Sequence, residues 1–405
     1  MMKIIVLQTL GGFGEGGATG GGNAHFAAMM HCWSSKSDVE VCLLTNDTDR
    51  GVDLHKYDGV ERVYVLPTIP LPSSLSNSAL SFLAQIIMNY FFQRKTVDAL
   101  MLKELNNKEE AIVVATTPYL SDVLSAMMVS GKFGLKAAVY FYHLSDPPWK
   151  FPLRRGPLRT TVNWVMNQLS LLIVKLCGML PGIDNPAMLH RSGWKFETVM
   201  PANISQGSGS ILIPPKPPIN FEGCFMGRIT KNKGIADILE AWGIVVRKIP
   251  HARIIIIGNS NSKSVENKIE RLMTRHGLKE NIVRRSWVSE EDKRSILTSS
   301  KLFVFPSYEE GWGISVMEAV SCGTLPITYD LLAYDYLGPK AVKVPVGNFR
   351  LLAERIIHYL SDRSDYEERV GALMKNISKY TLESVSEEQL KWLDTFMNGE
   401  NVKSR

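Results

Sequence analysis

Residues 303–328, FVFPSYEEGWGISVMEAVSCGTLPIT, decide the fold of this chain. The apolar run 302–305 ends at Pro306, which predicts a buried strand. A glycine-rich turn follows, and apolar residues then recur at helical spacing from Ile314 to Val320 before Cys322-Gly323. Residues 325–328 predict a second strand. The whole is a βαβ unit, which presents backbone N–H groups at the start of its helix.

Two acidic residues, Glu310 in the turn and Glu318 in the helix, lie eight residues apart, so both can face the strand ends. Acids near a helix start complement its dipole. That explains Glu310, but not the Trp312-Gly313 pair beside it or Glu318 well inside the helix. The run EGWG at 310–313, followed by EA at 318–319, resembles the signature of the retaining glycosyltransferases of family 4.

This resemblance implies the GT-B architecture, an α/β fold of two Rossmann-like domains facing a cleft. It also implies transfer of a sugar from a nucleotide-sugar donor with retention of anomeric configuration, and no metal or other cofactor. Glu318 would hold the ribose hydroxyls and Glu310 the donor sugar, with backbone amides at phosphate or sugar. The implied donor-binding residues are Gly227, Gly311, Trp312, Gly313, Ile314, Glu318 and Val288.

A second matched motif is Gly227-Arg228, followed after four residues by Lys233-Gly234. Departure of a nucleoside diphosphate builds negative charge on phosphate oxygens, which two cations and a helix N-terminus can stabilise. By resemblance, Arg228 and Lys233 contact the diphosphate and are catalytic together with Glu310. The alternative is a pair of solvated surface cations.

Residues 11–22 hold eight glycines directly after the first predicted strand. Such a loop lets backbone approach a ligand closely. It contains a G-x-G-x-x-G match at 12–17, which is weak evidence among so many glycines, and Asp47 lies too far along for the usual acidic partner. By resemblance, Gly21 and Gly22 belong to a loop facing donor phosphate and acceptor.

His143 ends a predicted strand at 137–143, which directs it toward a ligand site. The family has a histidine at the matching strand end, so His143 is a fourth candidate catalytic residue, although Asp146 is three residues on instead of adjacent. A lone histidine is also commonly structural. The Asp47-Thr48-Asp49 run looks like a metal site of another glycosyltransferase fold, but a solvated loop is the preferred interpretation.

Strands and helices alternate along both halves of the chain, which predicts two parallel sheets covered by helices. We expect an acceptor-side domain at 1–205, completed by a C-terminal helix at 383–400, and a nucleotide-sugar domain at 221–382. Residues 206–220 pass from Gly/Ser to Pro and predict the linker. We expect strands at 3–8, 39–45, 62–66, 111–116, 137–143, 179–183, 223–227, 253–258, 282–287, 302–305, 325–328 and 342–346. We expect helices at 22–34, 79–105, 119–131, 160–177, 185–192, 235–248, 264–276, 290–299, 314–322, 348–361 and 385–398.

The bulk composition fits a globular protein of 405 residues, 45% hydrophobic and 21% charged. The net charge of +6 suits anionic ligands but is too weak to indicate nucleic acid binding. The five cysteines form no C-x-x-C pair and the histidines show no metal spacing, which predicts free thiols and no metal site. We expect a cytoplasmic protein, without signal peptide or membrane span.

Two stretches suggest contact with the cytoplasmic face of a membrane. The segment 79–93 carries a broad apolar stripe, and basic residues at 150–159 precede an apolar helix. In that case the acceptor would be a lipid-linked saccharide instead of a soluble glycan. The alternative is that both helices simply cover the sheet.

Two other functions stay open. A GT-B sugar-nucleotide epimerase would convert the donor without an acceptor, and a non-catalytic module would bind nucleotide sugar without turnover. An NAD-dependent oxidoreductase explains only the N-terminal glycines. The nucleotide base, the sugar and the acceptor are not readable from the sequence.

Overall fold

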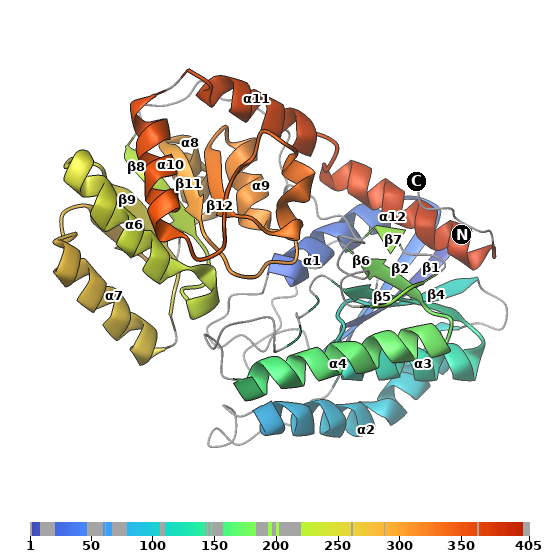
Figure 1. Ribbon diagram of the computed structural model, residues 1–405. Coiled ribbons are helices and arrows are strands. Elements are labelled where there is room, and N and C mark those ends of the chain that lie inside the picture. The colour runs from blue at the N-terminus through green and yellow to red at the C-terminus, as the bar shows by residue number, and fades with distance from the viewer. Residues whose placement is uncertain are drawn as a thin grey trace. The chain divides into compact units, whose positions relative to one another are not determined.

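The computed structural model describes residues 2–8, 21–46, 60, 62–66, 79–105, 110–141, 144, 147, 157–183, 193–196, 200–201, 220–260, 262–286, 288–362 and 364–399. The chain divides into two compact units. Unit 1 comprises residues 1–205 and 382–405, and unit 2 comprises residues 206–381. Each unit is an α/β domain built on one parallel sheet (Figure 1).

Unit 1 has a seven-stranded sheet in the order β3-β2-β1-β4-β5-β6-β7, and all its recorded pairings are parallel. Its strands are β1 (Met2–Gln8), β2 (Val39–Asn46), β3 (Arg62–Leu66), β4 (Ala111–Ala115), β5 (Lys136–Phe141), β6 (Leu180–Ile183) and β7 (Met200–Pro201). Its helices are α1 (Gly21–Ser34), α2 (Ala79–Glu104), α3 (Leu120–Phe133), α4 (Pro157–Leu176) and α12 (Leu382–Met397). Helix α12 packs on α1, whereas α2, α3 and α4 pack on one another (Figure 1).

The central strands of unit 1 are mainly apolar and buried because helices cover both faces of a parallel sheet. All five residues of β4 are buried, and so are the last six of β1. The side chain of Tyr140 on β5 is buried against Phe26 of α1, and its hydroxyl donates to Gln389 of α12 at 2.8 Å. This hydrogen bond anchors the last helix of the chain to the first sheet.

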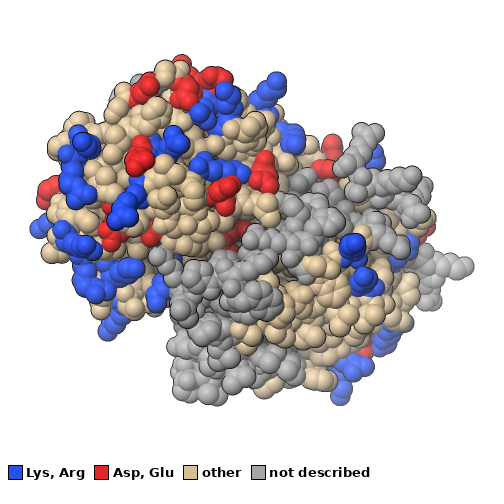
Figure 2. All heavy atoms as spheres, in the orientation of Figure 1, with Lys and Arg blue, Asp and Glu red and all other residues tan. Residues whose placement is uncertain are grey.

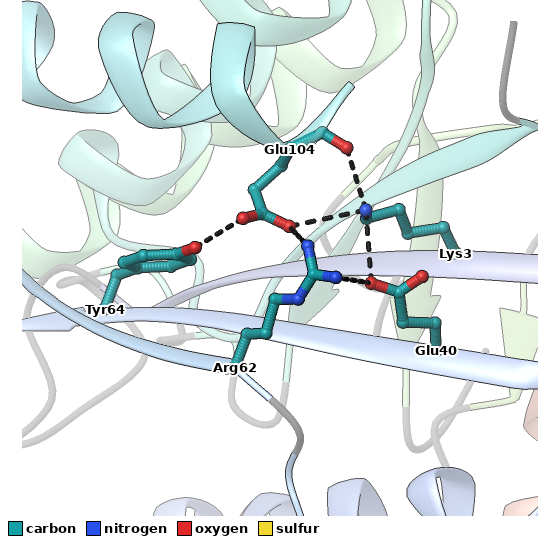
Figure 3. Close-up of polar contacts among 5 residues, drawn as sticks. All are labelled: Lys3, Glu40, Arg62, Tyr64 and Glu104. Carbon is teal, nitrogen blue, oxygen red and sulfur yellow. Dashed lines mark hydrogen bonds and ion pairs between the residues drawn. The ribbon is translucent and has the colours of Figure 1, made fainter. Parts of the chain in front are cut away.

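A buried charge cluster joins the starts of β1, β2 and β3 to the end of α2 (Figure 3). Lys3 Nζ lies 3.2 Å from Glu40 Oε1 and 3.3 Å from Glu104 Oε2, and it donates to the Glu104 carbonyl at 2.8 Å. Arg62 donates to Glu104 Oε2 at 2.6 Å, and the Tyr64 hydroxyl donates to the other carboxylate oxygen. The cluster therefore ties the C-terminus of α2 to the sheet.

Burial opposes ionisation of Glu104, but hydrogen bonds from Tyr64, Arg62 and Lys3 outweigh it and lower the pKa of this carboxyl. The hydrogen bond that Tyr64 donates to the Glu104 carboxylate raises the pKa of Tyr64 to about 12. Removing one partner from such a pair leaves a buried charge uncompensated.

Unit 2 has a six-stranded sheet in the order β10-β9-β8-β11-β12-β13, again with parallel pairings. Its strands are β8 (Phe221–Met226), β9 (Ile254–Ile257), β10 (Ile282–Arg285), β11 (Ser300–Phe305), β12 (Leu325–Tyr329) and β13 (Val342–Val344). Its helices are η3 (Lys231–Lys233), α6 (Ile235–Lys248), α7 (Lys263–His276), α8 (Glu290–Thr298), α9 (Ile314–Ser321), η4 (Leu332–Leu337), α10 (Phe349–Ser361) and α11 (Tyr366–Ile377).

The strand order of unit 2 reverses between β8 and β11, since β9 follows β8 on one side and β12 follows β11 on the other. In open α/β sheets, ligands bind beyond the carboxyl ends of the strands at such a switch point. The segments that leave β8 and β11 therefore start from the position where a ligand site is expected.

The predicted α/β class with two Rossmann-like domains is confirmed, and the predicted strands are present with ends shifted by a few residues. The strand expected at 342–346 ends at Val344 because Pro345 has no N–H to donate. The short strand β7 and the helices η3, η4 and α11 were not predicted. The helix expected at 185–192 and the linker residues 206–219 lie outside the described residues.

Candidate functional site

The candidate site lies in unit 2, where β8 and β11 end side by side. The chain leaving β8 passes through η3 into α6, and residues 306–313 lead from β11 to α9. The backbone N–H of Tyr308 donates to the carbonyl of Asn232 at 2.8 Å, and Ser307 Oγ donates to the same carbonyl at 3.2 Å. The two sequence motifs thus form one structure.

Gly234 makes this close approach possible. Its φ is +70°, in the left-handed region, and a Cβ built on it would lie 2.0 Å from the carbonyl oxygen of Pro306. A side chain at this position would force the two segments apart. The glycine of the second motif is therefore a packing requirement of the site.

Lys233 and Glu310 meet across these segments. Nζ of Lys233 donates to Oε1 of Glu310, and the two side chains are only 15% and 11% exposed. The same Nζ lies 5.5 Å from the centroid of the Phe305 ring, the last residue of β11. Arg228, the other predicted cation, is exposed just beyond β8. One predicted cation is thus paired with a predicted acid, and the other faces solvent.

Asp237, in the first turn of α6, fixes the segment that carries Glu310. Its buried carboxylate oxygen Oδ2 accepts hydrogen bonds from the hydroxyls of Tyr308 and Tyr329, the latter at 2.6 Å. Burial, with the negative charge of Asp237, raises the pKa of Tyr329 well above its usual range, so this phenol stays a neutral donor. Sequence reasoning missed this connection, because Asp237 is 71 positions from Tyr308 and 92 positions from Tyr329.

Helix α9 begins at the end of the same segment. Gly313 precedes it with φ +81°, and a Cβ there would lie 2.5 Å from Cε1 of Tyr334. The first intrahelical bond of α9 runs from the Val316 N–H to the Gly313 carbonyl at 2.8 Å. The N–H groups of Ile314 and Ser315 come before that bond, which is the arrangement that binds anions at helix starts.

Glu318, one turn into α9, faces Lys293 of α8. Lys293 Nζ lies 2.7 Å from Glu318 Oε1 and 2.6 Å from Glu290 Oε2. Burial raises the pKa of Glu318, and the positive charge of Lys293 partly opposes this rise. Burial also disfavours the charged form of Lys293, but the two carboxylates outweigh it and raise its pKa. Lys293 thus bridges the carboxyl groups of Glu318 and Glu290.

Lys293 was not among the residues predicted from the sequence. It is the first basic residue after three acids in the first turn of α8, where Glu290, Glu291 and Asp292 complement the helix dipole. Its i,i+3 ion pair with Glu290 is an ordinary helix-surface pattern, so the sequence carries no signal that separates Lys293 from other surface lysines.

Trp312 has a different environment from the one its donor-binding assignment suggested. Its indole is 5% exposed and stacks on Tyr336, with ring centroids 4.7 Å apart and planes 8° apart. Tyr380 meets the same indole edge-on, and the indole N–H donates to the sulfur of Met317. The side chain is packed into unit 2, so only the backbone of Trp312 can face a ligand.

The other predicted donor-binding residues lie on the same segments. Gly227 follows the last residue of β8, and Gly311 lies between Glu310 and Trp312; both are half-buried. Val288 is half-buried between β10 and α8. Their roles stay predictions.

In unit 1, Gly21 and Gly22 are the first two residues of α1, one residue before the predicted start of this helix at residue 22. The rest of the glycine-rich loop, 9–20, lies outside the described residues, as do His143, Asp146 and the run 47–49. Their roles also stay predictions.

All five cysteines are free thiols. Within the described part of the chain, no group of three or more His, Cys, Asp or Glu side chains is placed to hold a metal ion.

Comparison with known families agrees with this site. Residues 214–379 match the family described as glycosyl transferases group 1, and the matched range contains both motifs. This part of the chain is similar to the group 1 glycosyl transferases. The fold of the chain is GT-B, shared with the solved structures below.

Among curated relatives, this chain is 28% identical over 184 residues to the capsular polysaccharide biosynthesis glycosyltransferase CapM of Staphylococcus aureus, covering 44% of this chain and 47% of CapM. It is 26% identical over 160 residues to a GDP-mannose:cellobiosyl-diphosphopolyprenol alpha-mannosyltransferase of Xanthomonas oryzae, covering 38% of this chain and 42% of that protein. The chain thus spans less than half the length of these relatives.

Among solved structures, sucrose-phosphate synthase of Thermosynechococcus elongatus superposes with a TM-score of 0.76 at 15% identity, covering 99% of this chain and 100% of that one. Anabaena HepE in complex with UDP and glucose has a TM-score of 0.71 at 14% identity, covering 98% and 100%. At these identities the likeness concerns the fold.

Proposed function

We propose that this protein transfers a hexose-type sugar from a nucleotide-sugar donor to a glycan or lipid-linked saccharide, with retention of anomeric configuration. Unit 2 binds the donor and unit 1 the acceptor. The observation that carries the proposal is the joining of the two motifs at the switch point of unit 2, where Lys233 pairs with Glu310 and α9 begins beside them.

The charges suit a leaving nucleoside diphosphate. Lys233 holds its ammonium group at Glu310 before the donor arrives, so the cation is already oriented in a partly buried site. Arg228, exposed at the end of β8, supplies a second cation. Phosphate oxygens that gain charge as the sugar departs are stabilised by these groups and by the N–H groups at the start of α9.

Glu318 supplies the contact for the nucleoside. One carboxylate oxygen accepts from Lys293, and the carboxylate can accept further hydrogen bonds from ribose hydroxyls. Support for a nucleotide sugar comes from relatives: the Xanthomonas protein is named for GDP-mannose, and HepE was solved with UDP and glucose. The nucleotide base and the sugar of the donor are to be identified by the binding screen described below.

Retention is proposed without a covalent enzyme intermediate, because Glu310 is held by Lys233 and serves as a hydrogen-bond partner of the donor sugar. No metal is included, since the two cations and the helix start carry the charge stabilisation that a metal would otherwise supply. The transfer reaction is therefore expected to proceed in the presence of EDTA.

Lys233→Ala tests the proposal. UDP-, GDP- and ADP-sugars are first screened by thermal shift, because a ligand that binds the folded state raises the melting temperature. With the donor so found, Lys233→Ala is expected to lower the transfer rate more than tenfold, about 1.4 kcal/mol or more. Lys231→Ala, an exposed lysine two residues away in η3, is the matched control and should transfer as the wild type.

Product analysis identifies the reaction. Transfer requires an acceptor and yields an anomeric linkage that NMR can assign. Conversion of donor alone would indicate an epimerase, and donor binding without turnover would indicate a non-catalytic module. Wild-type transfer by Lys233→Ala would refute the diphosphate assignment.

A further inference from the structure

Exposed large apolar side chains gather on two helices of unit 1. The described part of the chain has ten large hydrophobic residues that are clearly exposed, and seven belong to α2 and α4. They are Met88, Phe91, Leu102, Val165, Leu169, Leu172 and Leu176, here called the α2–α4 apolar face. Only one of the ten, Val346, lies in unit 2. A soluble monomer rarely gathers such residues without a partner.

The α4 part of this face is a regular stripe. Its residues at 165, 169, 172 and 176 follow steps of four, three and four, so they lie on one side of the helix over about 16 Å. The opposite side is the one that packs in unit 1, through Met166, Leu171 and Val174. Helix α4 therefore has two apolar sides, and covering the sheet accounts for only one of them.

Helix α2 adds a second stripe. Phe91 is 65% exposed and Leu102 66%, values far above those of side chains that merely border a core. Helices α2 and α4 contact each other and lie side by side (Figure 1). The two stripes therefore belong to neighbouring helices of one layer.

The charges around these stripes have one sign. The exposed charged residues in the described parts of α2 and α4 are Arg94, Lys95, Lys103 and Lys175. The one acid there that is not buried, Asp98, is paired with Lys132 of α3 at 2.7 Å. Figure 2 shows the described surface over α4 as mainly tan, with blue side chains beside it.

We infer that the α2–α4 apolar face docks unit 1 on an anionic lipid surface. Apolar side chains enter the boundary of headgroups and acyl chains, and the flanking lysines and arginines meet lipid phosphates, each such contact being favourable near a charged membrane. A second copy of this chain would place the cations Arg94, Lys95 and Lys175 of both copies in one interface, where like charges repel. No helix in the described ranges is both long and apolar enough to cross a bilayer, so this binding is to the surface.

Sedimentation with lipid vesicles tests the inference. The full chain is mixed with phosphatidylcholine vesicles, or with vesicles in which about one lipid in three is phosphatidylglycerol. The wild type should bind the anionic vesicles at least tenfold more tightly, and salt should weaken this binding. The double variant Leu169→Glu/Leu172→Glu should bind the anionic vesicles at least tenfold more weakly than the wild type. The double variant Lys95→Glu/Lys175→Glu should lose the preference for phosphatidylglycerol.

Val346→Glu is the matched control, because it puts the same charge on an exposed apolar residue of unit 2. It should bind vesicles as the wild type. If the double variant fails to fold, Leu176→Glu replaces it, since that side chain is already 76% exposed. Equal binding to neutral and anionic vesicles, undiminished binding by the leucine variants, or a wild-type dimer in light scattering that these variants dissociate would each overturn the inference.

This binding is measured without a sugar donor, so it can succeed or fail independently of the proposed transferase reaction.

Discussion

Lys293→Met removes the cation that faces Glu318 and keeps a side chain of similar length. In the wild type this ammonium group lies 2.7 Å from Oε1 of Glu318, and both side chains are 22% exposed. Without this cation Glu318 is no longer held in place, so its proposed hydrogen bond to a ribose hydroxyl is lost, and a hydrogen bond to a charged group contributes about 1.5–3 kcal/mol. Because both groups are partly exposed, we expect the lower part of that range, about 1.5–2 kcal/mol, which corresponds to roughly 10- to 30-fold in affinity.

The loss should appear in the KM for the donor. Glu318 is proposed to hold the nucleoside, which does not change during transfer, so its contacts contribute equally to the ground state and the transition state. A change in such uniform binding raises KM and leaves kcat nearly unchanged. Initial rates at varied donor and saturating acceptor concentration measure both constants.

The pH dependence gives a second readout. Burial raises the pKa of Glu318 and Lys293 opposes that rise, so removing Lys293 raises the pKa further. As the pH is lowered, Glu318 then takes up its proton at a higher pH than in the wild type. On the acidic side, kcat/KM for the donor should therefore begin to decrease at a higher pH than in the wild type. Lys293→Arg should restore the wild-type profile, and Arg294→Met, at the next and exposed position, should not move it.

A KM within twofold of the wild type, together with an unchanged pH profile, would show that Lys293 neither positions nor ionises Glu318. A fall in kcat alone would contradict the assignment of Glu318 to the nucleoside.

Two further predictions concern the fold and the site. Glu104→Gln should destabilise unit 1 by about 3 kcal/mol in denaturant unfolding at neutral pH, because it leaves buried Lys3 with one fewer counter-charge. The pKa of Glu104 is lowered in the folded wild type, so its contribution to stability is present above pH 4.5 and is lost as the pH falls through the folded pKa. The variant should lack this part of the pH dependence of stability. An unchanged dependence at acidic pH would contradict the role of the cluster. Gly313→Ala should destabilise unit 2 by at least about 1 kcal/mol, since alanine is disfavoured at φ +81° and its Cβ would meet Tyr334. Thermal unfolding measures this, with Gly371→Ala, where a Cβ meets nothing within 4 Å, as the control.

Local patterns in the sequence were sufficient for most elements. The run 302–305 is apolar at every position and ends at proline, so it is compatible with a strand buried on both faces, and β11 is buried throughout. Helix α6 was predicted with its observed bounds because its apolar residues recur at helical spacing after a glycine. Strand β7 has only two residues and exists through its pairing with β6, so no local pattern could predict it.

The candidate site divides in the same way. The motifs at 227–234 and 310–319 were recognisable from the sequence by their resemblance to a known family signature. Their pairing was not, since Lys233 and Glu310 are 77 positions apart and meet only because β8 and β11 are neighbours in the sheet. The contact of Lys293 with Glu318 likewise depends on the packing of α8 beside α9.

For residues 303–328, local patterns were enough to predict a strand, a glycine turn and a helix with two acids. The groups that those acids meet depend on the tertiary fold: Glu310 faces Lys233 and Glu318 faces Lys293. The fold also decided that Trp312 packs inward among tyrosines. Helix and strand patterns depend on neighbours a few residues away, whereas the partner of a charged or aromatic side chain depends on which strands and helices the fold brings together.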